Sequence, residues 1–114
     1  AEAIGMRIEL FGELPEDTDL RKVFLIAIRE CLTNGVRHAD ATLIHAEIVR
    51  KSKSILLYIT NNGKPPEGVV VPKGGLLNLL RYVADCGGKM KIESLPQYVL
   101  SIELPSKNGE IEKE

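Results

Sequence analysis

Apolar residues recur every three or four positions along two stretches of the chain, the spacing found on the buried face of an α-helix. The first stretch runs from about Leu20 to His38 and follows Thr18 and Asp19, either of which could cap a helix. The second stretch runs from Leu76 to Cys86 and is bounded on both sides by glycine pairs. The sequence therefore predicts two helices, the first long and the second short.

Short runs of alternating polarity around these helices are typical of β-strands. Five strands are expected, over residues 6–11, 42–50, 54–60, 89–94 and 98–104. A tight polar turn at residues 51–53 joins the second and third strands as a hairpin. This order of elements does not suit a doubly wound parallel sheet. It predicts an α/β protein, a two-layer sandwich in which a mixed, mostly antiparallel sheet carries helices on one face.

The 114 residues are enough for one domain, and 44% apolar with 27% charged residues is ordinary for a globular fold. We place the domain at residues 1–105 and expect the charged segment 106–114 to be a disordered tail. A net charge of −1 gives no reason to expect nucleic acid or lipid as a partner. The sequence contains no signal peptide and no run of about 18 apolar residues, so a cytoplasmic domain without membrane contact is expected.

The two cysteines, Cys31 and Cys86, are far apart, and each lies within an apolar helical stretch. The sequence has no CxxC pair, and its two histidines stand in unrelated places, which argues against a zinc site. We expect both cysteines to be buried, reduced thiols.

Three polar residues of the first helix form a stripe at the edge of its apolar face. Glu30, Asn34 and Arg37 are spaced as i, i+4 and i+7. The carboxylate could accept a proton, the amide oxygen could ligate a hard cation, and the guanidinium could meet phosphate. From the spacing alone, a solvated flank with an ordinary charge network explains the stripe at least as well.

Two glycine-containing breaks interrupt the regular pattern. Residues 61–63, Asn-Asn-Gly, follow a strand, where a loop at the rim of a sheet can meet a ligand. Residues 73–76, Lys-Gly-Gly-Leu, open the second helix, where backbone N–H groups can approach an anion. The phosphate-binding motif GxxxxGK[S/T] and the dinucleotide motif GxGxxG are both absent from the sequence. Each break taken alone is also consistent with a plain turn.

Residues 29–42, Arg-Glu-Cys-Leu-Thr-Asn-Gly-Val-Arg-His-Ala-Asp-Ala-Thr, strongly resemble the N-box of the GHKL ATPase superfamily. The form is that of sensor histidine kinases of the nitrate-sensor and DesK-like type. Residues 58–63 resemble the G1 box of these kinases, and residues 73–79 resemble their G2 box. The resemblance extends over residues 4–105. The chain is thus similar to the catalytic ATP-binding (HATPase) domain of a bacterial two-component sensor histidine kinase.

What the resemblance implies is a Bergerat-type sandwich that binds ATP and Mg²⁺ between the N-box helix and the loops of the two glycine boxes. Asn34 would be the Mg²⁺ ligand that bridges the phosphates, and Glu30 the base that assists attack by a histidine. Asn61 would face the adenine amine, and Gly63 would let the base approach the backbone. The other residues implied at the nucleotide are Arg37 and His38, near phosphate or ribose, and Lys73, Gly74, Gly75 and Leu76, in the phosphate loop.

The activity that the resemblance implies is transfer of the γ-phosphoryl group of ATP to a histidine in a separate dimerisation domain. The phosphoryl group would pass from there to the receiver domain of a response regulator. Neither His38 nor His45 lies in a helix of the H-(D/E) type, so the acceptor histidine is expected outside this chain. The parent kinase would be a homodimer, whether or not it is anchored in the cell membrane.

The sequence departs from the family pattern at three places. Asn61 replaces the usual Asp of the G1 box, Lys73 replaces the first glycine of the G2 box, and Gln97-Tyr98 replaces a Gly-Thr before the last strand. We expect Tyr98 to be a strand residue at the rim of the base pocket. Residues 64–72 form a short loop with three prolines, which has little freedom to close over a nucleotide.

Two other functions fit the same pattern. A degenerate GHKL module would keep the fold as a regulatory or interaction platform with weak or no ATP binding, and the three departures favour it. An anti-sigma-type serine kinase shares the fold. The Arg37-His38 pair and the Ala-Asp-Ala-Thr that follows it favour the histidine-kinase form instead.

Overall fold

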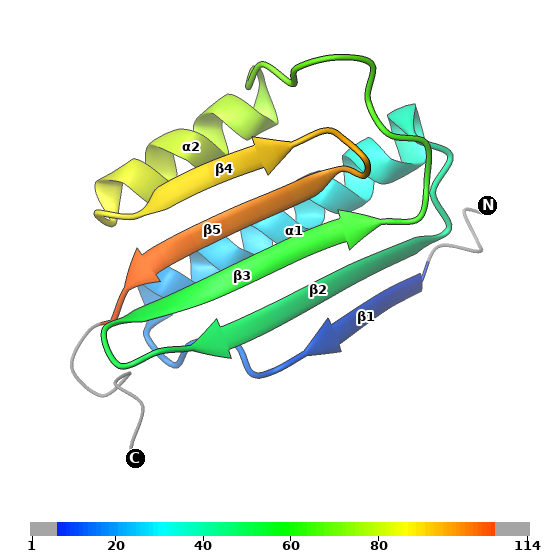
Figure 1. The fold of residues 1–114 in the computed structure, drawn as a ribbon. Helices are drawn as coiled ribbons and strands as arrows, with labels where there is room; N and C mark the ends of the chain where they lie inside the picture. The colour runs from blue at the N-terminus through cyan, green and yellow to red at the C-terminus, as the bar shows by residue number, and fades with distance from the viewer. Residues whose placement is uncertain (1–6, 107–114) are drawn as a thin grey trace.

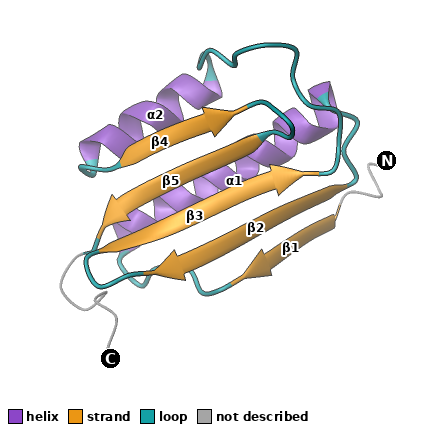
Figure 2. Cartoon of the chain, in the orientation of Figure 1, coloured by secondary structure: helices purple, strands orange, loops and turns teal. Residues whose placement is uncertain are grey.

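The structure is a computed structural model that describes residues 7–106, and residues 1–6 and 107–114 lie outside the described part. Five strands and two helices follow one another in the predicted order (Figure 1, Figure 2). Their bounds are β1 (Arg7–Phe11), α1 (Thr18–His38), β2 (Leu43–Arg50), β3 (Ser54–Asn61), α2 (Gly75–Asp85), β4 (Lys89–Glu93) and β5 (Val99–Pro105). The predicted elements are therefore present, with ends that differ by one or two residues.

The strands form one sheet in the order β1-β2-β3-β5-β4. β1 pairs with β2 in parallel, and the other neighbouring pairs are antiparallel. Both helices lie behind the sheet in Figure 1, so that one face is covered and the other is open. The prediction of a two-layer α/β sandwich with a mixed, mostly antiparallel sheet and helices on one face is confirmed.

The path of the chain explains the one parallel pair. Parallel neighbours need a long crossover, and α1 supplies it between β1 and β2. The chain leaves β1 through Gly12, whose φ of +91° suits glycine. A side chain at Gly12 would also overlap the carbonyl of Ile48. The predicted hairpin turn closes with a hydrogen bond of 2.8 Å from the Lys51 N–H to the Ser54 carbonyl.

α1 begins earlier than predicted, because Asp17 caps it. The Asp17 carboxylate accepts hydrogen bonds from the N–H groups of Asp19, over 2.9 Å, and Leu20, over 3.1 Å. These donors belong to the first turn, where backbone N–H groups have no partner within the helix. The prediction that Thr18 or Asp19 is the cap is therefore wrong, and both residues belong to the helix.

The core lies between the sheet and the helices. The apolar stripe predicted for the first helix is indeed the buried one, through Leu20, Val23, Phe24, Ala27 and Cys31. α2 adds its own buried residues, Leu76, Leu79 and Val83. The three central strands contribute alternate residues to the same cluster, namely Ile44, Ala46, Ile48, Ile55, Leu57, Ile59, Leu100, Ile102 and Leu104.

The thiols and the end of the described chain differ in part from expectation. Neither cysteine forms a disulfide, and Cys31 is buried as predicted, whereas Cys86 is only half-buried. Ser106 is the first residue of the predicted disordered tail, but its N–H donates to the carbonyl of Lys53 over 2.9 Å. The rest of the predicted tail lies outside the described residues.

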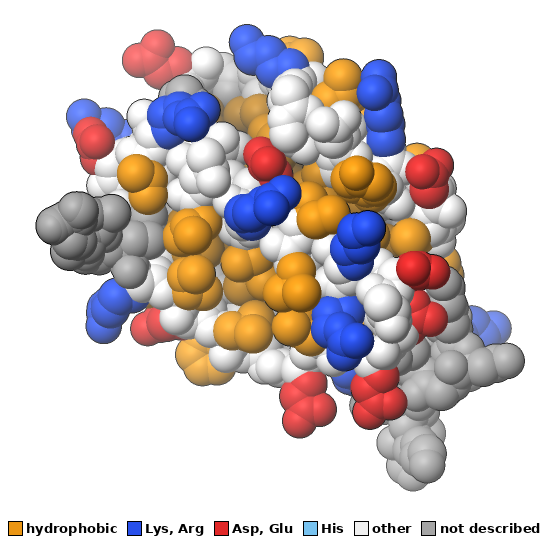
Figure 3. All heavy atoms as spheres, turned by 180° about the vertical axis from the view of Figure 1, so that it is seen from behind, with side chains coloured by type: hydrophobic (Ala, Val, Ile, Leu, Met, Phe, Trp, Pro, Cys, Tyr) orange, Lys and Arg blue, Asp and Glu red, His pale blue; other side chains and the backbone are white. Residues whose placement is uncertain are grey.

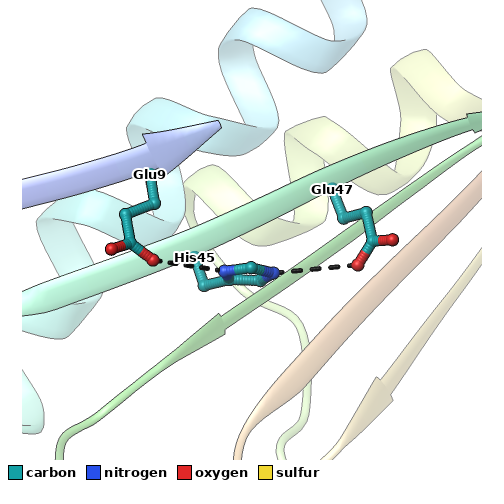
Figure 4. Close-up of polar contacts among 3 residues, drawn as sticks. All are labelled: Glu9, His45 and Glu47. Carbon is teal, nitrogen blue, oxygen red and sulfur yellow. Dashed lines mark ion pairs between the residues drawn. The ribbon is translucent and has the colours of Figure 1, made fainter. Parts of the chain in front are cut away.

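One face of the sheet carries no helix, and His45 lies on it. Buried Ile44 and Ala46 alternate with His45 along β2, so the imidazole points away from α1. Figure 4 shows the ring between two carboxylates, with His45 Nδ1 3.5 Å from Glu9 Oε1 and Nε2 3.7 Å from Glu47 Oε1. His45 therefore belongs to a surface cluster on the opposite side of the sheet from the polar stripe.

Part of the helix-bearing side is apolar and exposed. Leu25 and Val36 of α1, and Ile8 and Leu10 of the edge strand β1, are between 43% and 48% exposed. Figure 3 views the molecule from this side and shows hydrophobic side chains gathered across it. We call these four residues the α1–β1 apolar surface. Exposed apolar surface of this kind often marks a contact site.

Within residues 7–106, no helix combines the length and the apolar character that crossing a membrane requires.

Candidate functional site

The C-terminal end of α1 is joined to the loop that follows β3. The N–H of Lys64 donates to the carbonyl of Ala39 over 2.9 Å. Gly63 packs so closely on Ala39 that a side chain at position 63 would overlap that backbone carbonyl. The joint between helix and loop therefore requires glycine at position 63 for the protein's own backbone, before any ligand is considered.

Asn62 anchors the same loop to the start of β2. Its Oδ1 accepts hydrogen bonds from the N–H groups of Thr42, over 2.9 Å, and Leu43, over 3.0 Å. Its Nδ2 donates to the Thr42 hydroxyl over 3.0 Å. This anchoring role of Asn62 is not among the predictions, although an asparagine in a turn beside glycine is a recognised signal for such bonds.

The start of α2 packs on the middle of α1. Gly75 is the first residue of α2, and a side chain there would overlap the carboxylate of Glu30. The half-buried Glu30 thus places its negative charge at the N-terminal end of α2. The helix dipole and the N–H groups of the first turn favour an anion at this position. Two of the predicted site residues, from distant parts of the sequence, are therefore in contact.

The other residues of the polar stripe lie at the margin of the core. Asn34 is half-buried and lies outside the apolar cluster, and Arg37 is exposed. Among the described side chains, neither Glu30 nor Arg37 forms an ion pair, so the charge network considered above does not form. The side chain of His38 lies outside the described part of the structure.

The predicted phosphate loop turns into α2 with its backbone open to solvent. Lys73 and Gly74 are exposed, and Gly74 has a φ of +58°. A side chain at Gly74 would meet nothing within 4 Å, so the backbone conformation rather than crowding favours glycine there. The side chain of Leu76 is buried in the core, and its N–H donates to the carbonyl of Lys73 over 3.2 Å.

At the carboxyl end of β3, Asn61 is a buried polar residue, with 7% of its surface exposed. Its Oδ1 accepts a hydrogen bond of 2.8 Å from the N–H of Gly63. The Nε2 group of Gln97 donates to the carbonyls of both Asn61 and Gly63. The amide oxygen of Asn61 is therefore engaged by its own loop, and its Nδ2 has no hydrogen-bond partner among the described residues.

Tyr98 lies deeper than expected, because its side chain is part of the core rather than of a rim. Only 7% of its surface is exposed, and its hydroxyl lies beside the Cys31 thiol of α1. Tyr98 immediately precedes β5 and continues the alternation of its buried residues Leu100 and Ile102, which directs the ring inward. Burial raises the pKa of the Cys31 thiol to about 12 and also raises the pKa of the Tyr98 hydroxyl. Both groups are therefore neutral near pH 7, and Cys31 is an unreactive thiol.

Two open grooves lie elsewhere on the helices. One, of about 420 Å³, runs along the first half of α1, and the other, of about 360 Å³, lies between that half and the end of α2. Neither is lined by a residue of the polar stripe or of the loops 61–63 and 73–76. These grooves therefore do not coincide with the site that the sequence predicts.

Solved structures of histidine kinases have a fold similar to that of this chain. The histidine kinase domain of the blue-light-activated kinase EL346 from Erythrobacter litoralis superposes with a TM-score of 0.72 at 14% identity, over 90% of this chain. The kinase AdeS from Acinetobacter baumannii gives 0.68 at 16% identity, over 93% of this chain. The ATP-binding domain of PrrB from Mycobacterium tuberculosis gives 0.68 at 21% identity, over 91% of this chain. The chain has the fold of a histidine-kinase ATP-binding domain.

This chain corresponds to about half of two of the matched chains and to most of the third. The chain spans 52% of the EL346 domain and 57% of the AdeS chain, but 82% of the PrrB ATP-binding domain. At these identities the likeness establishes the histidine-kinase ATP-binding fold and not the chemistry of individual residues. No protein-family profile and no curated protein sequence matches the chain.

Proposed function

We propose that the chain is the ATP- and Mg²⁺-binding catalytic domain of a bacterial sensor histidine kinase, of the nitrate-sensor and DesK-like type. The observation that carries the proposal is the contact between Glu30 of α1 and Gly75 of α2. It brings the polar stripe, with Asn34 one turn further on, against the glycine-rich start of a helix. The histidine-kinase ATP-binding fold is a second, independent support.

The phosphate end of the proposed site has the groups that a nucleoside triphosphate needs. The exposed Gly74 and the half-buried Gly75 open a helix, and the exposed Lys73 adds a positive charge beside it. Residues 7–106 contain no group of three His, Cys, Asp or Glu residues able to hold a metal alone. In this proposal Asn34 would supply one oxygen ligand, and phosphate oxygens and water would complete the shell of Mg²⁺.

In this proposal the side chains position groups and balance charge. Bound Mg²⁺ would neutralise charge on the phosphates. The amide oxygen of Asn34 would hold the ion, and Lys73 and Arg37 would bring positive charge to the phosphate oxygens. The Glu30 carboxylate orients the incoming imidazole and accepts its proton. His45 lies on the opposite face of the sheet, and neither His38 nor His45 belongs to a helix of the H-(D/E) type. The acceptor histidine would therefore come from a separate dimerisation domain, and a receiver domain would then take the phosphoryl group.

The α1–β1 apolar surface supports a partner of this kind. Leu25 and Val36 lie on the helix that carries Glu30 and Asn34, one on each side of them in sequence. The surface faces the β1 edge of the sheet, whereas Glu30 faces α2, so a partner on this surface would have to extend beyond it to bring a histidine to the phosphates. We assign this surface to the histidine-bearing dimerisation domain of the parent kinase, whose apolar helices would cover it.

Two observations favour the second candidate, a degenerate module that keeps the fold with weak or no ATP binding. Tyr98 is buried at the end of the sheet where the adenine would lie, and the oxygen of Asn61 is already engaged by its loop. The two candidates differ in whether nucleotide and Mg²⁺ bind together at Asn34.

Replacing Asn34 with alanine tests the proposal. In the native chain, Mg²⁺ and a non-hydrolysable ATP analogue together should raise the free energy of unfolding, by about 2.7 kcal/mol when the nucleotide is at roughly 100 times its Kd. Asn34→Ala should remove the part of this stabilisation that depends on Mg²⁺, because the only proposed protein ligand of the ion is lost. Thermal unfolding with and without Mg²⁺ measures the difference.

Thr33→Ala is the matched control, because Thr33 is an exposed polar neighbour of Asn34 on the same helix. It should leave the effect of Mg²⁺ unchanged. Absence of any stabilisation of the native chain at millimolar nucleotide would reject ATP binding and leave the degenerate module. An Mg²⁺ effect that survives in Asn34→Ala would reject the role of Asn34.

A further inference from the structure

The aromatic ring of Tyr98 fills the space between the end of the sheet and α1. Thr60 pairs with Val99 at the end of the β3–β5 ladder, so Asn61 is the next residue of β3 and Tyr98 is the residue just before β5. The Thr60 hydroxyl donates to the Tyr98 carbonyl over 2.6 Å, which fixes the backbone from which the ring projects. Both Asn61 and Tyr98 have 7% of their surface exposed and lie on the helix-facing side.

Packing, rather than polar bonding, holds the ring in this place. The Tyr98 hydroxyl is buried without a hydrogen bond of ordinary geometry to any described group, and it lies beside the weakly polar Cys31 thiol. A buried hydroxyl without a partner loses its bonds to water and gains none in return. The polar end of this side chain is therefore poorly matched to its surroundings, while its flat ring fits them.

The surroundings of the ring are suited to a flat group with polar edges. The side chain of Asn61, which is buried at the same end of the sheet, has an Nδ2 without a hydrogen-bond partner among the described residues. The Tyr98 hydroxyl lies near the thiol of Cys31 and, one residue earlier on α1, the half-buried carboxylate of Glu30. Glu30 in turn contacts Gly75, so the space occupied by the ring adjoins the proposed phosphate end.

We propose that Tyr98 occupies the base end of the nucleotide site, and that a purine enters only when this ring moves out. The inference rests on the proposed function, since it concerns the same site. A displaceable ring explains why the phosphate end of the proposed site is open to solvent while its base end is occupied. A chain in which the competent arrangement is a minor one binds nucleotide more weakly, in proportion to the population of that arrangement.

The test compares Tyr98→Thr and Tyr98→Phe with the native chain, by calorimetric titration with an ATP analogue and Mg²⁺. Tyr98→Thr should bind the analogue about tenfold or more tightly than the native chain, because no ring has to be displaced. Tyr98→Phe keeps the ring and should bind as the native chain does. Inorganic tripolyphosphate has no base, so both variants and the native chain should bind it equally.

A second measurement keeps the inference testable if Tyr98→Thr fails to fold. In the native chain with fluorotyrosine incorporated, the resonance of Tyr98 should acquire the solvent sensitivity of an exposed ring when the analogue is added. The partly exposed Tyr58 and Tyr82 serve as internal references. A Tyr98 resonance that stays solvent-protected at saturating nucleotide overturns the inference.

The outcomes separate this inference from the proposed function. If the native chain binds the analogue in an Mg²⁺-dependent way and Tyr98→Thr binds it no more tightly, the inference fails and the proposed function stands. Equal gains in Tyr98→Phe and Tyr98→Thr also overturn it, because the hydroxyl rather than the ring would then be responsible. If neither the native chain nor Tyr98→Thr binds nucleotide or tripolyphosphate, the proposed function fails, and the inference fails with it.

Discussion

Replacing Glu30 with glutamine is expected to slow phosphoryl transfer from ATP to a histidine-bearing dimerisation domain, supplied separately, by about 100-fold or more. Glutamine keeps the shape of the side chain but cannot accept the proton of the attacking imidazole. Nucleotide binding should be retained or improved, because the substitution removes a negative charge from the end of α2 where the phosphates are proposed to lie. Single-turnover transfer of labelled phosphate and a parallel binding titration measure the two effects.

Glu103→Gln provides the control for the change in net charge. Glu103 is exposed on β5 and lies outside the proposed site, so its substitution should alter neither transfer nor binding. Transfer at the native rate by Glu30→Gln contradicts the role of Glu30 as a base. Loss of nucleotide binding in the same variant would instead make Glu30 a structural support for the start of α2.

A methyl group at Gly63 is expected to destabilise the protein by about 2–3 kcal/mol and to lower its melting temperature by roughly 10 °C. The overlap in Gly63→Ala is with the backbone carbonyl of Ala39, which cannot rotate away as a side chain can. Moving this carbonyl would also disturb its hydrogen bond with the N–H of Lys64. Thermal or denaturant unfolding of the full chain measures the loss.

Gly68→Ala separates crowding from backbone conformation. Gly68 has a φ of +87°, and a side chain there would meet nothing within 4 Å. The strain of a left-handed backbone should then be the main effect, about 1 kcal/mol. If Gly63→Ala loses no more free energy of unfolding than Gly68→Ala, the loop after β3 can move to accommodate the methyl group, and the close contact with Ala39 does not require glycine.

Most of the fold followed from the period of the apolar residues. The spacing of Leu20, Phe24, Ala27 and Cys31 identified the buried face of α1, because burial of one helical face is a property of the local sequence. The boundary at Asp17 was missed, since three polar residues in succession can each cap a helix and only the path of the chain selects one. The parallel pairing of β1 with β2 also depends on that path. The alternation of polar and apolar residues within a strand does not indicate which strand it pairs with, or in which direction.

The candidate site was predictable only in part. The spacing of Glu30 and Asn34 placed them on one stripe, but their approach to Gly75 depends on how α2 packs across α1. The inward position of Tyr98 was hidden because a tyrosine at the start of a strand is compatible with either face. The bonds of Asn62 and Gln97 join segments that are distant in sequence, and no local pattern reports such contacts.

The central claim is that Mg²⁺ and nucleotide bind between the polar stripe of α1 and the start of α2. Mapping of backbone amide chemical shifts by NMR, during titration of the chain with an ATP analogue and Mg²⁺, tests it directly. If nucleotide and Mg²⁺ bind there, saturable shifts should centre on Glu30, Asn34 and residues 73–76, and the residues around Asn61 at the base end should shift as well. Shifts confined to the groove lined by Arg21, Lys22 and Leu25, or no saturable shifts at millimolar nucleotide, would contradict it.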